Sequence, residues 1–379
     1  MTLRGARVAV DASTTVRRDV AISHGRISFY APGYEGVDLS GFLLLPGFIN
    51  AHDHLEFNLF PRLGTRMYSN ATEWAEDVYR PETGPVREQL RIPKQTRLMW
   101  GGVKNLLSGV TTVAHHNPYH PVFEENFPVR VVKAFDWAHS LAFSPDLVER
   151  FRAGSSDRPF VIHAAEGIDP AAADEIVRLN DLGLLTPRTV LVHALALSAA
   201  DIALVREKGV SIVWCPTSNL STYGRTLTAD LLRSGIPIAL GSDSAITADG
   251  DLMDEIGAAS KCSIEAGRIY EMVTTGAARI LRLRNGEGTI VEGGVADLVG
   301  VRDEGQSPAE AILGLRPEFV ITAGRVKGVR SETREGFSGL DAFHPLHVDG
   351  RGDWLVDVKI PSLMTGSQLR VAGRLVLAG

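Results

Sequence analysis

The chain has 379 residues, a formal net charge of −6 at pH 7 and a sequence pI near 6.0. Such a length accommodates an α/β barrel of about 250 residues together with a smaller domain. The mild acidity excludes the basic surface that is typical of nucleic-acid-binding proteins. No stretch is apolar over enough residues to span a bilayer, and the first residues lack the apolar core of a secretory signal. Two cysteines, Cys215 and Cys262, make no disulfide framework, which is typical of a protein in the reducing cytoplasm. From these properties together we expect a cytoplasmic protein that binds neither nucleic acid nor membrane.

The predicted elements divide the chain into three segments. Short β segments separated by turn residues occupy 1–45, strand–helix alternation runs over 46–283, and β signals return over 284–379. The strands expected in the two end segments are 6–10, 20–22, 26–29 and 42–45, and then 296–301, 320–321, 355–360 and 370–377.

His52 and His54 close the apolar run Leu-Leu-Pro-Gly-Phe-Ile-Asn-Ala that begins at position 44. In an extended strand, residues two apart project from the same face, so these imidazoles lie side by side at the carboxyl end of a strand. Two imidazoles on one face are half of a first-row metal site, although the motif alone also arises by chance on protein surfaces.

Later strands end in polar residues in the same way. His163 and His193 each follow an apolar strand, and Asp243 follows Ile-Ala-Leu-Gly-Ser at 238–242. Another strand leads into Cys-Pro-Thr-Ser-Asn at 215–219. A (β/α) barrel builds its active site from the carboxyl ends of its strands, so these residues are predicted to meet at one face of a barrel.

The chain resembles the amidohydrolase superfamily, in the branch of the cytosine, adenosine and guanine deaminases and the triazine hydrolases. The resemblance rests on motifs that are spread over about three quarters of the chain, namely Pro-Gly-Phe-Ile-Asn-Ala-His-Asp-His at 46–54, Gly-Val-Thr-Thr-Val at 109–113, His-Ala-Ala-Glu at 163–166, Val-His at 192–193, Cys-Pro-Thr-Ser-Asn at 215–219, Gly-Ser-Asp at 241–243 and Gly-Thr-Ile-Val-Glu-Gly-Gly-Val-Ala-Asp-Leu-Val at 288–299. It implies a distorted (β/α)8, TIM-like barrel over 46–283 and a small β-sandwich that both chain ends form, from 1–45 and 284–379.

The barrel region has one irregularity. Strands are expected at 111–116 and 129–135, and 160–163 resembles the fifth strand of the family. Only 24 residues, 136–159, separate the last two, whereas one strand–helix–strand unit takes about 30. Seven strands are therefore predicted where eight are expected: either the third or the fourth strand is reduced, or 135–139 continues the previous strand after a bend.

The metal ligands that the resemblance implies are His52, His54, His163 and Asp243, around one divalent ion, zinc or iron. A catalytic zinc ion lowers the pKa of its water to about 7, and Asp243 is placed to take the proton. His193 is expected to orient the attacking water or to polarise the leaving group. Glu166, one helical turn after His163, is expected to shuttle a proton between a ring nitrogen and the departing group.

Two-metal relatives carry a carboxylated lysine between the ions, and Lys133 is the only candidate here. Its position is also that of an ordinary strand lysine with a solvated end, so one metal ion is predicted. Weaker predictions place Trp74, His116, His139 and Asn219 in contact with substrate.

The resemblance implies a hydrolase of carbon–nitrogen bonds that takes a small, planar, nitrogen-containing substrate, with hydrolytic deamination favoured. Hydrolysis of a cyclic amide or a triazine-type displacement is the alternative reaction. A non-catalytic scaffold is the alternative class, disfavoured because a scaffold does not need a complete polar cluster. A homo-oligomer is compatible with the sequence, which does not identify the substrate.

Overall fold

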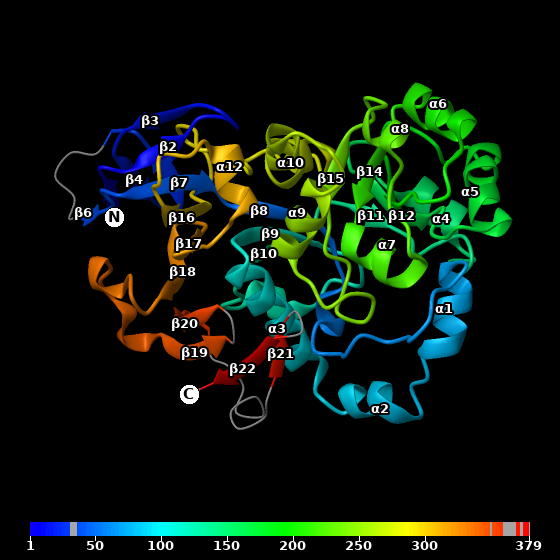
Figure 1. Cartoon of the computed structure of the whole chain (residues 1–379), viewed down its shortest axis with the longest axis horizontal. Helices are drawn as coiled ribbons and strands as arrows, with labels where there is room; N and C mark the ends of the chain where they lie inside the picture. Colours follow the sequence, from blue (N-terminus) through cyan, green and yellow to red (C-terminus); the bar gives the residue numbers. More distant parts are fainter. Residues whose placement is uncertain (31–35, 349–350, 359–368, 372–373, 379) are drawn as a thin grey trace.

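The computed structural model describes residues 1–30, 36–348, 351–358, 369–371 and 374–378. An all-β part and an α/β part lie side by side (Figure 1). Strands near the N-terminus lie beside strands from the last third of the chain, and the middle of the chain forms the α/β part.

The all-β part contains two sheets. The first has four strands in the order β5-β4-β1-β6, and the second has ten strands in the order β21-β22-β19-β20-β18-β17-β16-β7-β2-β3 among the described residues. Their bounds are β1 (Thr2–Arg4), β2 (Arg7–Ala9), β3 (Thr15–Arg17), β4 (Val20–Ser23), β5 (Arg26–Ser28), β6 (Gly36–Asp38), β7 (Phe42–Pro46), β16 (Leu298–Arg302), β17 (Phe319–Thr322), β18 (Arg325–Arg330), β19 (His344–Val348), β20 (Gly352–Val356), β21 (Leu369–Val371) and β22 (Arg374–Ala378).

The two ends of the chain meet in the ten-stranded sheet, where β7 pairs antiparallel with β16 over five residues. The two sheets also share an apolar cluster, to which Leu3 and Ile27 contribute from one sheet and Leu44 and Phe319 from the other. Burial of these side chains stabilises the contact by about 25 cal/mol per Å² of apolar surface.

The α/β part contains eight strands among the described residues. They are β8 (Phe48–Asp53), β9 (Val110–His115), β10 (Arg130–Val131), β11 (Asp136–Trp137), β12 (Phe160–Ala164), β13 (Thr189–His193), β14 (Ser211–Trp214) and β15 (Ile238–Leu240). All pairings within the orders β10-β9-β8 and β11-β12-β13-β14-β15 are parallel. A parallel bridge between Asp53 and Asp243 links the two sheets. The carboxyl ends of β8 and β15 therefore lie next to each other.

The predicted strand at 129–135 is wrong. Its residues form β10 and then cross to the neighbouring sheet, where β11 begins at Asp136. Val132 still donates its backbone N–H to Val113 (2.9 Å), while Asp136 donates to Pro159 (2.9 Å). The apolar side chains of Val132 and Phe135 are buried along this crossing, which is why the run looked like one strand. Both the third and the fourth strands are reduced to two residues, and no helix separates them.

The helices of the α/β part follow the strands. Their bounds, with those of the short 3-10 turns and of α12, are η1 (Leu55–Phe57), α1 (Ala71–Val78), α2 (Gly84–Leu90), α3 (Lys94–Leu107), η2 (Pro121–Glu124), α4 (Leu147–Ala153), α5 (Pro170–Asp181), α6 (Ala199–Glu207), α7 (Pro216–Tyr223), α8 (Ala229–Leu232), α9 (Leu252–Ser260), α10 (Ala266–Val273), α11 (Thr275–Ile280), α12 (Pro308–Leu313), η3 (Arg334–Gly336) and η4 (Leu340–Ala342). Within the described ranges, no helix combines the length and the apolarity needed to cross a membrane.

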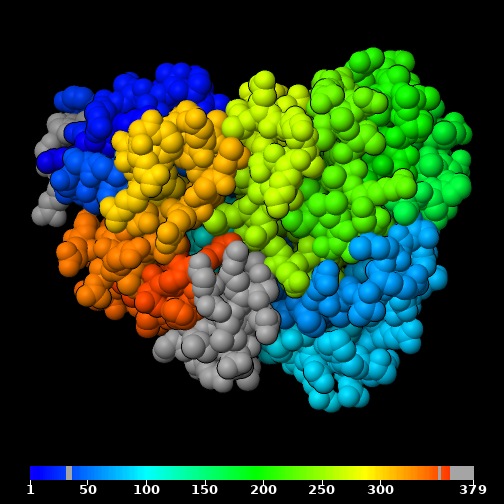
Figure 2. Space-filling model, in the orientation of Figure 1, coloured from blue at the N-terminus to red at the C-terminus, as the bar shows by residue number. Residues whose placement is uncertain are grey.

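Helix α1 lies against the end of β12. Asn70 caps its N-terminus by accepting a hydrogen bond from the backbone N–H of Glu73, and Ala71 donates its backbone N–H to the carbonyl of Glu166 (3.1 Å). Figure 2 shows the light-blue segment that contains α1 in contact with the green segment on this face of the molecule. Helix α1 is thereby held beside the residues that follow His163.

Most predicted strands of the end segments coincide with observed ones. The predictions at 6–10, 20–22, 26–29, 42–45, 296–301 and 320–321 correspond to β2, β4, β5, β7, β16 and β17. The prediction at 355–360 overlaps the end of β20, and its last two residues lie outside the described residues. The prediction at 370–377 covers parts of β21 and β22, and residues 372–373 lie outside the described residues.

Candidate metal-dependent active site

Five predicted site residues meet at the carboxyl ends of the parallel strands. His52 lies on β8 and His54 directly after it, His163 lies on β12, His193 ends β13, and Asp243 follows β15. All five are buried, with exposed fractions between 0% and 7%. Parallel strands place their carboxyl ends at one face, which is why residues almost 200 positions apart in the sequence converge.

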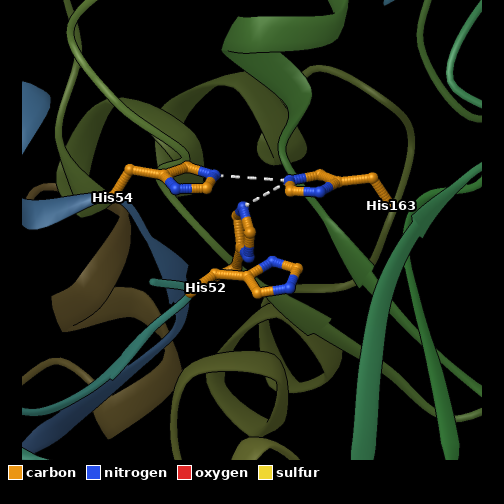
Figure 3. Close-up of side chains that lie close together, drawn as sticks. His52, His54 and His163 are labelled. Atoms are coloured by element: carbon orange, nitrogen blue, oxygen red, sulfur yellow. Dashed lines mark hydrogen bonds between the residues drawn. The ribbon is translucent and has the colours of Figure 1, made fainter. Parts of the chain in front are cut away.

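The imidazole nitrogens of His52, His54 and His163 face one another (Figure 3). Nε2 of His163 lies 3.2 Å from Nε2 of His52 and 3.3 Å from Nε2 of His54. Oδ1 of Asp243 lies 3.6 Å and 3.7 Å from the same two nitrogens. Ligands bound to zinc at 2.0–2.1 Å in a tetrahedral arrangement lie about 3.3 Å apart, so the four atoms fit one divalent cation.

The protonation of His163 supports this fit. Its Nδ1 lies 2.8 Å from the backbone carbonyl of His139, which can only accept a hydrogen bond. Nδ1 therefore carries the proton and the lone pair of Nε2 faces the cluster. Burial lowers the pKa values of His52, His54 and His163, so all three are neutral at pH 7, as metal ligands must be.

Two hydroxyl groups orient Asp243. Ser218 and Thr247 each donate a hydrogen bond to Oδ2 at 2.7 Å, which leaves Oδ1 toward the histidines. Burial raises the pKa of the Asp243 carboxyl, but the neighbouring imidazoles of His52, His193 and His54 outweigh it, and the net pKa lies below its usual range. Sequence reasoning missed both hydroxyls, although Ser218 lies in the Cys-Pro-Thr-Ser-Asn motif that pointed to this strand end.

A buried polar network supports His52 and His54. Asp53, which lies between them, accepts hydrogen bonds from Asn58 (2.7 Å) and Asn105 (2.8 Å). Lys104, 1% exposed, donates to Oδ1 of Asn58 (2.6 Å) and supplies a positive charge near Asp53. Gly241 completes the packing, because a Cβ there would lie 2.7 Å from Cβ of His52.

Glu166 and His193 form the proton-transfer side of the site. Oε1 of Glu166 lies 3.5 Å from Nε2 of His193 and accepts a hydrogen bond from the Tyr223 hydroxyl at 2.8 Å. Nδ1 of His193 donates to Oδ1 of Asn219 (2.9 Å), so Nε2 is the nitrogen that faces Glu166. Burial raises the pKa of Glu166, although His193 and Tyr223 oppose the rise. The net rise brings the pKa of this carboxyl closer to neutral pH, where a proton shuttle works best.

The backbone is held in an uncommon conformation next to these groups. Ala165, His193 and Asp243 have φ values of 51°, 72° and 54°, in the left-handed region that non-glycine residues seldom adopt. Such conformations persist where the surrounding structure enforces them, and they cluster at functional sites.

A cavity of about 960 Å³ opens onto the cluster. His54, His163, Glu166, His193 and Asp243 form part of its wall. Its remaining wall is largely aromatic or apolar and includes Phe57, Trp74, Tyr79, Trp137, Phe143 and Ile246. Arg150, the positively charged residue in the wall, is paired with Asp146 at 2.8 Å. The cavity therefore suits a planar substrate without a strong negative charge.

The four residues predicted to contact substrate divide into two pairs. Trp74 and His139 line the cavity. His116 and Asn219 do not line the cavity. His116 is 1% exposed and lies behind the histidine cluster, and Asn219 accepts a hydrogen bond from His193. Their prediction as substrate contacts is therefore not supported by the geometry, because both side chains are turned toward other site residues.

Lys133 lies away from the cluster. Its side chain is 59% exposed and forms an ion pair with Glu124. A lysine in this position does not bridge two ions, in agreement with the prediction of one metal ion.

Comparison with known proteins identifies the family. Residues 123–330, more than half of the chain, match the model of the amidohydrolase family. The chain belongs to this family. It is a metal-dependent hydrolase that acts on carbon–nitrogen bonds other than peptide bonds.

Two curated relatives carry the same activity name. The 5-methylthioadenosine/S-adenosylhomocysteine deaminase 2 of Archaeoglobus fulgidus is 26% identical over 356 residues, covering 75% of this chain and 81% of the relative. The 5-methylthioadenosine/S-adenosylhomocysteine deaminase of Teredinibacter turnerae is 35% identical over 135 residues, covering 33% of this chain and 30% of the relative.

Solved structures share the fold. An adenosine deaminase from Xanthomonas campestris with bound zinc has a TM-score of 0.69 and 20% identity, covering 86% of this chain and 92% of that one. Atrazine chlorohydrolase from Arthrobacter aurescens TC1, complexed with zinc, has a TM-score of 0.70 and 19% identity, covering 86% and 94%. The TM-scores of the deaminase and the chlorohydrolase are nearly equal, so the fold alone does not distinguish between these two reactions.

Proposed function

We propose that the protein is a zinc-dependent hydrolytic deaminase of an amino-substituted, nitrogen-rich heterocycle. The observation that carries this proposal is the position of Glu166. Its carboxyl group lines the cavity together with His54, His163 and Asp243, and lies beside Nε2 of His193. A carboxyl group so placed can move protons to a ring nitrogen and to a leaving amine, which deamination requires.

The proposed ligands are Nε2 of His52, His54 and His163 and Oδ1 of Asp243. A zinc ion bound there lowers the pKa of water to near 7 and so supplies a nucleophile at neutral pH. Asp243 and the three neutral imidazoles together carry one negative charge, which partly balances a divalent ion. The zinc-containing structures with this fold support the choice of metal.

The proposed reaction exchanges an exocyclic amine for oxygen. A carbon–oxygen bond forms to the carbon that bears the amine, the carbon–nitrogen bond breaks, and ammonia leaves. Of the two protons of water, one ends on the ring nitrogen and the other on the departing amine. Asp243 accepts a proton from the attacking water at the start and passes it on, and Glu166 delivers the two protons to the ring nitrogen and the departing amine. His193 orients the attacking oxygen through Nε2.

The substrate that the site favours is a purine-like ring with an uncharged or apolar substituent. The large, aromatic cavity extends well beyond the histidine cluster, and its arginine is already paired. Trp74 is proposed to stack on the ring, and His139 to contact its polar edge. The names of the curated relatives, deaminases of sulfur-substituted adenosines, agree with such a substrate.

The same proposal covers the architecture. We divide the chain into a distorted TIM-like barrel over 46–283 and a β-sandwich built from 1–45 and 284–379. The eight parallel strands support the barrel, and the pairing of β7 with β16 over a core shared by two sheets supports the sandwich. We place the enzyme in the cytoplasm, which the unpaired Cys215 and Cys262 favour.

An assay of product release tests the reaction. The zinc-loaded protein is incubated with adenosine, 5′-methylthioadenosine, cytosine, an aminotriazine, a chlorotriazine and a cyclic amide, and ammonia, chloride and ring opening are measured. We expect ammonia from the aminopurines, and none after the metal is removed by a chelator. Release of chloride or ring opening without ammonia from any aminopurine would refute the proposal in favour of the alternative hydrolases.

A further inference from the structure

His116 is a buried imidazole next to the histidine cluster, and the proposed reaction assigns it no role. It follows β9 and is 1% exposed. Its Nε2 lies 3.0 Å from the backbone carbonyl of Ala138. A carbonyl oxygen only accepts hydrogen bonds, so Nε2 carries the proton and Nδ1 carries a lone pair. Nδ1 is buried and has no hydrogen-bond partner among the described residues.

A ring nitrogen of His116 lies close to donor atoms of the proposed metal ligands. Donor atoms of His52, His54, His116 and His163 all lie within 4.8 Å of one another. The ring of His116 stacks on that of His163, with centroids 4.5 Å apart and an interplanar angle of 18°.

His116 and His163 are braced in the same way. Nε2 of His116 donates to the carbonyl of Ala138, and Nδ1 of His163 donates to the carbonyl of His139, the next residue. Each bond fixes the tautomer and leaves the other ring nitrogen unprotonated. Metal-ligating histidines commonly donate their second N–H to a carbonyl in this manner. Since His116 does not line the cavity, its free nitrogen is not available to substrate.

We propose that His116, through Nδ1, is a further metal ligand, so that its imidazole joins those of His52, His54 and His163 around the ion. This inference rests on the metal site of the proposed function and adds a ligand to it. A buried nitrogen lone pair without a donor is unfavourable, and a cation shared with His52, His54 and His163 satisfies it.

X-ray absorption on the zinc-loaded protein counts the imidazoles directly. The wild type is expected to fit four imidazoles and the variant His116→Gln three. Glutamine retains a donor near the position of Nε2 for the Ala138 carbonyl and lacks the nitrogen at the position of Nδ1. Zinc affinity, measured by chelator competition, is expected to fall at least about tenfold in this variant.

The control is His120→Gln, which changes a histidine of the same loop that caps η2 and lies outside the donor groups. It should retain the wild-type imidazole count and zinc affinity. An equal imidazole count in the wild type and in His116→Gln overturns the proposal, even if affinity falls, because a supporting role would lower affinity without changing the count.

If His116→Gln does not fold, the wild-type crystal structure with zinc decides. A distance of about 2.0–2.1 Å from the ion to Nδ1 of His116 is expected, and a distance beyond bonding range overturns the proposal. These measurements do not depend on turnover. Failure of the deaminase proposal appears in the ammonia assay, and failure of this one appears in the coordination of zinc.

Discussion

The hydroxyl group of Tyr223 donates a hydrogen bond of 2.8 Å to Oε1 of Glu166, the carboxyl group that lies 3.5 Å from His193. Tyr223 is 2% exposed and ends α7, so its phenol is held in place by the core. The bond favours the ionised form of Glu166 and opposes the burial that raises its pKa. Tyr223 is thus a positioning residue for the proposed proton shuttle.

Tyr223→Phe should shift the acid limb of the pH profile of kcat/KM to higher pH. Loss of the hydrogen bond raises the pKa of Glu166 further, so the ionised form that accepts a proton is lost at a higher pH. We expect about a tenfold loss of rate, which corresponds to one hydrogen bond of about 1–1.5 kcal/mol, with unchanged zinc content. Tyr270→Phe, at a buried tyrosine outside the site, is the control. An acid limb that does not move in Tyr223→Phe would show that the bond does not tune Glu166.

Lys104→Met should lower the free energy of unfolding by about 3–5 kcal/mol. The substitution removes a buried positive charge, so the buried carboxylate of Asp53 loses the cation that stabilises it. The measurement is chemical denaturation of the metal-free protein. Lys261→Met, at an exposed lysine after α9, should change stability by no more than about 0.5 kcal/mol. Equal stabilities of the two variants would mean that Lys104 does not balance the charge of Asp53.

Stability should fall as the pH rises from about 5 to 8, in part because of Glu255. Burial raises the pKa of Glu255 from 4.5 to about 8, although the backbone N–H (2.9 Å) and hydroxyl of Thr217 donate hydrogen bonds to it. Because the folded pKa lies above the unfolded value, the contribution is complete below pH 4.5 and is lost as the pH passes 8.

Glu255→Gln should therefore lose less stability than the wild type over this range, by an amount on the order of a few kcal/mol. Denaturation at pH 5, 6.5 and 8 measures the difference, and Glu88→Gln, at an exposed position, should follow the wild type. Parallel stability curves for Glu255→Gln and the wild type would contradict the assignment.

The positions of the proposed metal ligands were predictable because they depend on local rules. Residues two apart on a strand share a face, and parallel strands bring their carboxyl ends together, so His52, His54, His163 and Asp243 meet whatever the details of the helices. The crossing at 132–135 was not predictable, because an apolar run does not reveal that the chain leaves one sheet for another. The orientation of His116 depends on the carbonyl of Ala138, and the partner of Glu166 is Tyr223, 57 positions away. Neither contact leaves a local signal in the sequence.

In the proposed reaction, Glu166 moves protons and does not hold the metal. Glu166→Gln should keep its zinc and lose turnover by about 10²- to 10⁴-fold, the usual contribution of a proton shuttle. His163→Ala should lose metal and activity together, because it removes one of the three clustered Nε2 atoms.

The most direct test measures zinc content and ammonia release side by side in the wild type, Glu166→Gln and His163→Ala. We expect full zinc with little turnover in Glu166→Gln, and neither zinc nor turnover in His163→Ala. Turnover of Glu166→Gln within about threefold of the wild type would show that Glu166 takes no part in proton transfer and is only a buried partner of the Tyr223 hydroxyl.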